Sequence, residues 1–215
     1  MTGLFITFEG TEGCGKSTQI SLLAEKLRSL GRIVHTLREP GGTAIGEEIR
    51  HTLKHSSSNH GMTSEAELLL MNASRAQLVR EVIRPALAAS EVVLCDRFYD
   101  STVAYQGYGR HLDLKMVQAI IDVAVGVTRP DLTLLLQIPQ AVSEERQRSR
   151  QAQQAATRDR FEEADRSFFQ RVAEGYEIIA KAEPQRIKAI DATGTVEAVS
   201  AAIWQQVDAS LKARN

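Results

Sequence analysis

The stretch Gly10-Thr11-Glu12-Gly13-Cys14-Gly15-Lys16-Ser17 fits the eight-residue pattern of a phosphate-binding loop, the P-loop. An apolar run precedes it at 4–8, and apolar residues at helical spacing follow it. Glycines allow a tight turn whose N–H groups point at an anion, and the N-terminus of the next helix adds its positive dipole end. Lys16 supplies a charge to terminal phosphates, and the Ser17 hydroxyl can bind Mg²⁺. The pattern predicts a nucleoside triphosphate site; the alternative is a Gly-rich turn that binds nothing.

Short apolar runs alternate along the chain with segments whose apolar residues recur at helical spacing. Strands are expected at 4–8, 33–37, 92–95, 132–138 and 187–190. Ser64 and Glu67 resemble a capping box at the start of a long helix. Strands separated by helices form right-handed crossovers. We therefore predict an α/β fold of three layers, a five-stranded parallel sheet with helices on both faces.

Composition excludes several classes of protein. The 215 residues include 26 Lys+Arg and 27 Asp+Glu, which gives a formal net charge of −1 and argues against bulk nucleic-acid binding. Two cysteines make no disulfide framework, and the five His are scattered rather than spaced as metal ligands. We expect a single domain over 1–215, with no signal peptide or membrane span, in the cytoplasm.

Polar side chains gather after the third apolar run. Asp96 and Arg97 follow it at its carboxyl end, where ligands of open α/β sheets bind. If this strand lies beside the first, Asp96 can hold Mg²⁺ through water, and Arg97 can grip a phosphate through two hydrogen bonds. The alternative is an ordinary ion pair at a strand end. Other candidate side chains near this edge are Arg50, Arg75, Ser101, Thr102, Tyr105 and Gln106, although Arg50 could be solvated, Arg75 could form a local salt bridge and Tyr105 could belong to the core.

Missing motifs narrow the class of nucleotide-binding protein. The chain contains neither the Asn-Lys-x-Asp of guanine-reading GTPases nor an ABC-type Leu-Ser-Gly-Gly-Gln, which leaves mostly small-molecule kinases. From about residue 4 to the last helix it resembles the bacterial thymidylate kinases. The blocks that carry the resemblance, in the family's order, are 8–18, 38–43 (Arg-Glu-Pro-Gly-Gly-Thr), 74–79, 96–97, 101–107, 129–133 and 159–162.

The resemblance implies transfer of the γ-phosphoryl group of ATP to dTMP, giving dTDP, with Mg²⁺ and in a homodimer. Glu12 would reach the 3′-hydroxyl of dTMP, Arg97 would hold its phosphate with help from Arg50, Arg75 would bind the thymine carbonyl edge, and Tyr105 would lie against the deoxyribose. Ser101, Thr102 and Gln106 complete the expected substrate site, and Ser17 and Asp96 the metal site. ATP would contact Gly10, Thr11, Glu12, Gly13, Cys14, Gly15, Lys16, Ser17 and Thr18.

An Arg-rich stretch at 143–160 matches a short lid of this family, which in one class supplies a catalytic Arg. The expected catalytic residues are Lys16, Arg97, Glu12 and one of Arg148, Arg150 and Arg158; the alternative for the stretch is a solvated helix with ion pairs to Glu144 and Glu145. Two positions depart from the family. Met71 replaces a Phe that stacks on thymine in many relatives, and Gln137 replaces an Asp.

Two alternatives stand beside a dTMP kinase. One is a kinase for another nucleoside monophosphate or a small metabolite. The other is an ATP-binding regulatory module without turnover. The Arg-rich stretch and the Asp96-Arg97 pair favour an enzyme, and a test of activity against several nucleoside monophosphates discriminates among the three.

Overall fold

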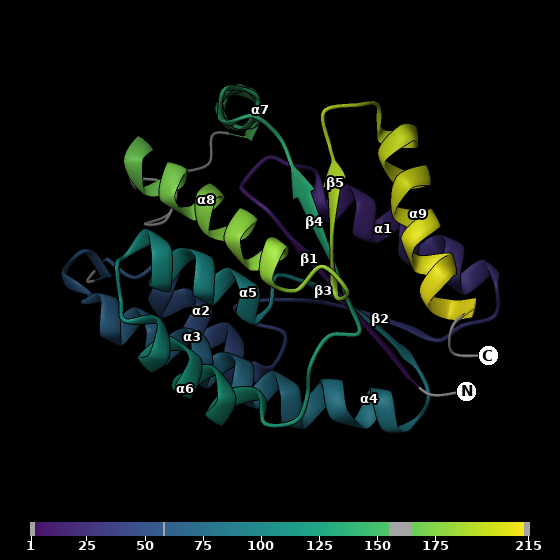
Figure 1. Cartoon of the computed structure of the whole chain (residues 1–215). Coiled ribbons are helices and arrows are strands. Elements are labelled where there is room, and N and C mark those ends of the chain that lie inside the picture. Colours follow the sequence, from purple (N-terminus) through teal and green to yellow (C-terminus); the bar gives the residue numbers. More distant parts are fainter. Residues whose placement is uncertain (1–2, 58, 155–164, 213–215) are drawn as a thin grey trace.

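The computed structural model describes residues 3–57, 59–154 and 165–212. At its centre is one sheet of five parallel strands in the order β2-β3-β1-β4-β5 (Figure 1). The strands are β1 (Leu4–Glu9), β2 (Val34–Arg38), β3 (Val92–Asp96), β4 (Leu132–Gln137) and β5 (Ile187–Asp191). The predicted α/β fold with a five-stranded parallel sheet is confirmed. The central β1 pairs with β3 on one side and β4 on the other, so the first and third strands are neighbours as the site prediction requires.

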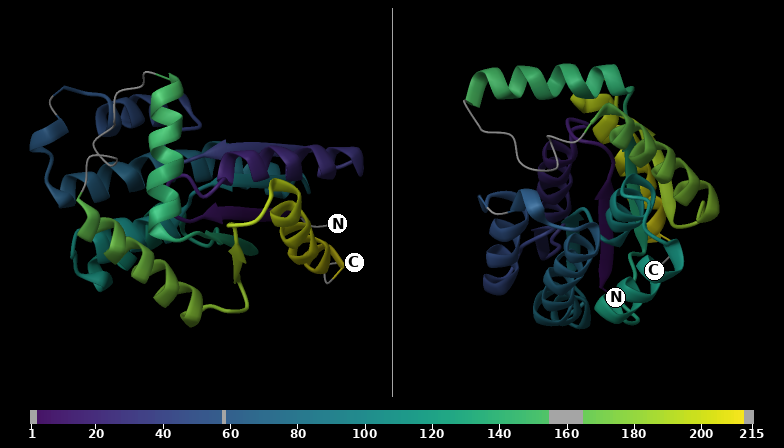
Figure 2. Two further views of the ribbon diagram at one scale, coloured as in Figure 1. Left: turned by 90° about the horizontal axis from the view of Figure 1, so that it is seen from above. Right: turned by 90° about the vertical axis from the view of Figure 1, so that its left-hand side faces the viewer.

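Helices cover both faces of the sheet, as Figures 1 and 2 show. One face is covered by α1 (Lys16–Ser29) and α9 (Val196–Lys212). The other is covered by α3 (Ser64–Leu78), α4 (Arg84–Ala88), α6 (Leu114–Val125) and α8 (Arg166–Ala182). The remaining helices are α2 (Ala44–Lys54), α5 (Tyr99–Thr102) and α7 (Gln140–Gln154). Among the described helices, none is long and apolar enough to cross a membrane.

The two faces of β1 divide the core. Leu4, Ile6 and Phe8 pack toward α1 and α9, because alternate residues of a strand point to opposite faces. Phe5 belongs to the core on the other side. By the same alternation Thr7 and Glu9 point to that second face, and both are fully buried. The strand therefore carries a carboxyl group into the protein interior at its last residue.

The start of α3 differs from the prediction. Its N-cap is Thr63, whose Oγ1 accepts a hydrogen bond from the backbone N–H of Ala66 at 3.2 Å. Glu67 does not reach back to the cap. It is fully buried and accepts from Arg110 and Gln106, because the turn in which it lies faces the interior. The predicted capping box is therefore wrong: the N-cap is Thr63 and not Ser64, and Glu67 binds side chains of the interior instead of the cap.

Two π-helical segments interrupt the helical layer on this face. They are η2 (Val79–Ile83), between α3 and α4, and η3 (Val103–Gly109), which continues α5. Pro85 lies in the first turn of α4, which continues η2 directly, and it donates no backbone hydrogen bond to the preceding turn. A short 3-10 turn, η1 (Asn59–Gly61), follows α2. The segment η3 carries Tyr105 and Gln106 toward the carboxyl ends of the strands.

Candidate active site

The loop between β1 and α1 closes tightly because glycine occupies positions where a side chain does not fit. A Cβ atom on Gly10 would lie 2.3 Å from the carbonyl oxygen of Leu136 on β4. Gly15 adopts the left-handed region with a φ of 95° and caps the start of α1. The loop therefore delivers the N-terminus of α1 to the carboxyl edge of the sheet, where its backbone N–H groups and dipole attract an anion.

Lys16 is the first residue of α1, and its ammonium lies over this loop. Its Nζ donates to the carbonyl oxygens of Gly10 at 3.2 Å and Thr11 at 3.1 Å. Burial would lower the pKa of Lys16, but the nearby Cys14, Glu12 and Asp96 raise this pKa above its ordinary value. Lys16 is therefore a permanent positive charge at neutral pH.

The oxygens of Ser17 and Asp96 meet in front of the loop. Ser17 Oγ donates to Asp96 Oδ2 at 3.4 Å, and Asp96 Oδ1 is buried without a hydrogen-bond partner in the described part of the chain. Carboxylate and hydroxyl oxygens suit Mg²⁺, which usually takes few protein ligands and completes its shell with water and phosphate. The oxygens of Ser17 and Asp96 therefore fit Mg²⁺ bound together with a nucleotide. Among the described residues, no group of three or more acidic, His or Cys side chains could hold a metal.

A polar cavity opens over the loop. Its lining brings together the predicted Glu12, Gly13, Gly15, Lys16, Ser17, Thr18, Arg50, Asp96 and Arg97, and adds Arg38, Glu39, Lys54 and Arg146. Arg50 donates to the carbonyl oxygen of Pro40 at 2.8 Å, which fixes its side chain at the edge of this cavity. A cavity rich in cations and next to a helix N-terminus suits polyanionic ligands.

Arg97 lies between this cavity and a second one. Its backbone has a φ of 69°, in the left-handed region that is unusual for a residue with a side chain. Nη2 donates to Glu12 Oε1 at 3.0 Å and Tyr105 Oη at 3.1 Å, while Nη1 donates to Ser101 Oγ and Tyr176 Oη, both at 3.1 Å. Burial works against the charge of Glu12, but Arg97 and Lys16 hold the pKa of Glu12 well below its usual range. The pair is ionised at neutral pH.

The second cavity is narrower and more apolar. It is lined by the predicted Glu12, Met71, Arg75, Arg97, Ser101, Thr102, Tyr105 and Gln106, together with Glu39, Pro40 and Lys54. Every predicted substrate residue except Arg50 lines it, and Arg50 lines the adjoining polar cavity. Tyr105 is both a lining residue and part of the core, so the two roles considered for it from the sequence coexist. Gln137 lines neither cavity.

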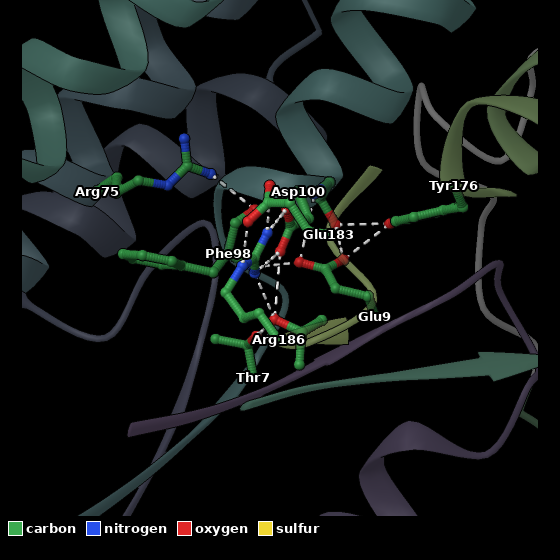
Figure 3. Close-up of polar contacts among 10 residues, drawn as sticks. Thr7, Glu9, Arg75, Phe98, Asp100, Tyr176, Glu183 and Arg186 are labelled. Atoms are coloured by element: carbon green, nitrogen blue, oxygen red, sulfur yellow. Dashed lines mark hydrogen bonds and ion pairs between the residues drawn. The ribbon is translucent and has the colours of Figure 1, made fainter. Parts of the chain in front are cut away.

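Arg75 is held almost completely inside the protein at the far wall of this second cavity. Its Nε donates to Glu39 Oε2 at 2.8 Å and Nη1 to Asn72 Oδ1 at 2.7 Å. Nη2 donates to the carbonyl oxygen of Phe98 at 3.2 Å (Figure 3). Nη2 also lies 2.7 Å from Glu39 Oε2. A guanidinium carries five N–H groups, so these contacts leave one donor on Nη1 for a ligand. The Arg75 side chain is therefore held rigidly, with one N–H group available to a ligand.

The arginines of the predicted lid divide between described and undescribed parts of the chain. Arg158 lies outside the described residues, as does the side chain of Arg150. Arg148 lies on α7, pairs with Glu144 at 3.5 Å and lines a separate cavity between α7 and α8, so the structure does not bring it to the phosphate cavity. Arg146 does line that cavity, and it donates to the carbonyl oxygens of Gly13 and Ala192. Figure 2 shows α7 crossing above the carboxyl ends of the strands.

Several residues of the site were not identified from the sequence. Lys54 lines both cavities, as does Glu39, which was predicted only as part of the 38–43 block; Arg146, which lies in the predicted Arg-rich stretch but was given no role, lines the polar one. Glu9 and Tyr176 bond to the groups that hold Arg97. A signal was available for Glu9, since an acidic residue at the end of a buried apolar strand needs a function or a partner. Tyr176 gave no such signal, because it falls on the apolar stripe of a helix and resembles core packing.

The fold and this edge of the sheet define a class of protein. A P-loop, a Ser–Asp pair suited to Mg²⁺ and an arginine shared by two adjoining cavities are the parts of a P-loop nucleotide kinase, in which two anionic substrates meet.

Comparison with known proteins gives the family. The thymidylate kinase family model matches residues 8–203. Thymidylate kinases of Syntrophotalea carbinolica and Geobacter sulfurreducens are 50% and 48% identical, with alignments covering 93% of both chains and 94% of both chains respectively. The crystal structure of thymidylate kinase from Ehrlichia chaffeensis superimposes with a TM-score of 0.77 at 30% identity, covering 96% of this chain and 100% of that one. The chain belongs to the thymidylate kinase family. The predicted family is confirmed, and with it an enzyme that phosphorylates dTMP to dTDP with ATP as donor.

Proposed function

We propose that the polar cavity binds the phosphates of ATP and receives the phosphate of dTMP, while the narrower cavity binds the nucleoside of dTMP. The observation that carries this assignment is that Glu12, Glu39, Lys54 and Arg97 line both cavities, so the two substrates meet at one wall. The P-loop amides of residues 10–18 and the Lys16 ammonium would hold the ATP phosphates. The two alternatives, a kinase for another nucleoside monophosphate or small metabolite and an ATP-binding module without turnover, are less well supported because the chain belongs to the thymidylate kinase family.

The dTMP side follows from the donors that remain. Arg97 would grip the phosphate at the junction, with Arg50 beside it. The last N–H of Arg75 would donate to the thymine carbonyl edge, Met71, Thr102 and Gln106 would surround the base, and Tyr105 would lie against the deoxyribose. Glu12 stays ionised beside Arg97 and can accept from a sugar hydroxyl. Because a phosphate oxygen of dTMP is already the nucleophile, no protein group need act as general base.

Mg²⁺ belongs to this proposal as well. Ser17 Oγ and Asp96, directly or through water, would hold it in front of the P-loop. Bound there, the ion neutralises phosphate charge and orients the γ-phosphoryl group. Lys16, Arg97 and the backbone amides supply the remaining positive charge. We keep the proposal that one of Arg148, Arg150 and Arg158 is the catalytic arginine of the lid. Arg146 is the arginine of α7 that lines the polar cavity.

Arg97→Ala tests the assignment of the two cavities. We expect the KM for dTMP to rise at least tenfold, since a hydrogen bond to a charged group contributes about 1.5–3 kcal/mol, while the KM for ATP changes less than about twofold. ADP release is measured with dTMP and with a panel of other nucleoside monophosphates. Equal loss for both substrates would show that Arg97 is misplaced, and preference for another monophosphate would refute the substrate assignment.

We further propose a homodimer in the cytoplasm. Exposed apolar side chains form a stripe on α6 at Met116 and Val123, and Leu69 is exposed on the adjacent α3, so the two helices present an apolar surface to a second copy. Sedimentation velocity of the wild-type chain tests this, and a mass of one chain at micromolar concentration would refute it. Cys14 and Cys95 are buried free thiols, which suits a reducing compartment.

A further inference from the structure

Two buried polar side chains lie directly behind Arg97, and the proposed reaction does not use them. Glu9 ends β1 and is completely buried. Tyr176 comes from α8, far along the chain, and is 4% exposed. Figure 3 shows the Tyr176 hydroxyl pointing at the Glu9 carboxyl group. Their contacts decide how the arginine of the site is held.

The hydrogen bonds of Glu9 fix the direction of two hydroxyl groups. Oε1 accepts from the backbone N–H groups of Phe98 at 2.8 Å and Ser101 at 3.3 Å. Oε2 accepts from the hydroxyls of Ser101 and Tyr176, the latter at 2.8 Å. When Glu9 is ionised, above its raised pKa of about 7, its carboxylate has about four acceptor sites, and these four donors fill them. The two hydroxyl oxygens also lie 2.8 Å apart, and either can donate to the other, so both hydroxyl hydrogens are directed within the cluster of Glu9, Ser101 and Tyr176.

The consequence falls on Arg97. Since each hydroxyl gives its hydrogen to Glu9 or to the other hydroxyl, each presents an oxygen lone pair to Arg97, whose Nη1 lies 3.1 Å from both oxygens. Burial, and next the charge of Glu9, raise the pKa of Tyr176 well above its ordinary value, so the phenol keeps the hydrogen that it donates. The other nitrogen, Nη2, is held separately by Glu12 and Tyr105.

We propose that Glu9 and Tyr176 are positioning residues for phosphoryl-acceptor binding: the Glu9 carboxylate turns the Ser101 and Tyr176 hydroxyls so that their oxygens hold Nη1 of Arg97 in place for the phosphate of dTMP. This rests on the proposed role of Arg97. A neutral amide in place of Glu9 would turn an N–H toward the two hydroxyls, and a hydroxyl hydrogen would then face the guanidinium, donor against donor.

Tyr176→Phe removes the hydroxyl and keeps the ring. The matched control is Tyr108→Phe, because Tyr108 lies on η3 against Gly175 of α8 and its hydroxyl has no hydrogen-bond partner within the described ranges. Calorimetric titration with dTMP and with thymidine, which lacks the phosphate, separates the two halves of the site. We expect Tyr176→Phe to weaken the affinity for dTMP about tenfold, the size expected for the loss of one hydrogen bond to a charged group. The affinity for thymidine and the KM for ATP should change by less than about twofold.

The control and a second variant complete the test. Tyr108→Phe should change neither affinity, and Glu9→Gln should weaken dTMP at least as much as Tyr176→Phe while sparing thymidine. Unchanged dTMP affinity in Tyr176→Phe and Glu9→Gln would overturn the inference, as would equal loss for thymidine, which would mark a merely structural role. If Tyr176→Phe does not fold, Glu9→Gln decides alone. If the wild-type chain binds thymidine as tightly as dTMP and Arg97→Ala alters neither, the assignment of Arg97 itself fails.

Discussion

Arg186 and Asp100 form a buried ion pair that ties the start of β5 to α5, and its loss should weaken the fold strongly. Arg186 Nη1 lies 2.7 Å from Asp100 Oδ2, and Nη2 lies 2.8 Å from Oδ1, a geometry with two parallel hydrogen bonds. The Asp100 side chain is only 2% exposed. Thr133 Oγ1 is its other side-chain donor, at 3.3 Å. The substitution Arg186→Met would therefore leave a carboxylate inside the protein with almost no compensation.

The magnitude follows from the charge that remains. Breaking a buried pair by removing one partner costs about 3–5 kcal/mol. The loss of stability has an upper limit, because an uncompensated carboxyl group can take up a proton instead. At pH 7, which is roughly three pH units above the ordinary pKa of aspartic acid, protonation costs about 1.36 kcal/mol per unit, or about 4 kcal/mol. At pH 5 the same limit is about 1.5 kcal/mol. For a chain of this length, about 4 kcal/mol lowers the melting temperature by roughly 8–16 °C.

Urea denaturation of the wild-type chain and Arg186→Met at pH 7 and pH 5 measures this loss. Arg129→Met is a matched control, because Arg129 also lies over the ring of Tyr99 but pairs with Asp122 at the surface, where the two side chains are 38% and 52% exposed. An exposed pair contributes at most about 1 kcal/mol. If Arg186→Met costs no more than Arg129→Met, or costs as much at pH 5 as at pH 7, the argument from an uncompensated buried charge is refuted.

Two further predictions concern the start of α3 and the end of β1. Thr63→Ala should cost about 1 kcal/mol of stability in urea denaturation and Ser64→Ala less than about 0.5 kcal/mol, because Thr63 is the N-cap; the reverse order would restore the predicted capping box. Burial, followed by the charge of Asp100, raises the pKa of Glu9 from 4.5 to about 7 despite its donors. Between these values the folded chain keeps a proton that the unfolded chain has lost, so its free energy of unfolding should fall with rising pH relative to Glu9→Gln, by on the order of 3 kcal/mol; a difference constant with pH would contradict this.

The strands of the sheet could be predicted from the sequence because a strand that is buried on both faces is apolar along most of its length. The run Leu132–Gln137 is almost entirely apolar, as a strand covered on both faces must be, and its neighbour Ile187–Asp191 was found despite its weaker pattern. The order of the strands was not predicted: the site required the third strand to lie beside the first, and the structure pairs them with Phe8 opposite Asp96. The start of α3 was misjudged because Thr63 and Ser64 are both good caps, and only the backbone decides between them.

The residues behind Arg97 show where such prediction stops. Every predicted substrate residue reaches one of the two cavities, and all except Arg50 and Met71 lie in short blocks that follow the carboxyl ends of strands or belong to α3. Tyr176 is joined to Glu9 across 167 positions of sequence, and its place on a helix predicts only that it faces inward. Whether an inward tyrosine packs against apolar neighbours or donates to a carboxylate depends on what another element brings to the same point. The periodicity of one helix carries no information about which groups other elements bring next to it. An acidic residue at the end of a buried strand, such as Glu9, is therefore the better sequence signal, because a buried carboxyl group needs hydrogen-bond partners. Here those partners include the hydroxyls that hold Arg97.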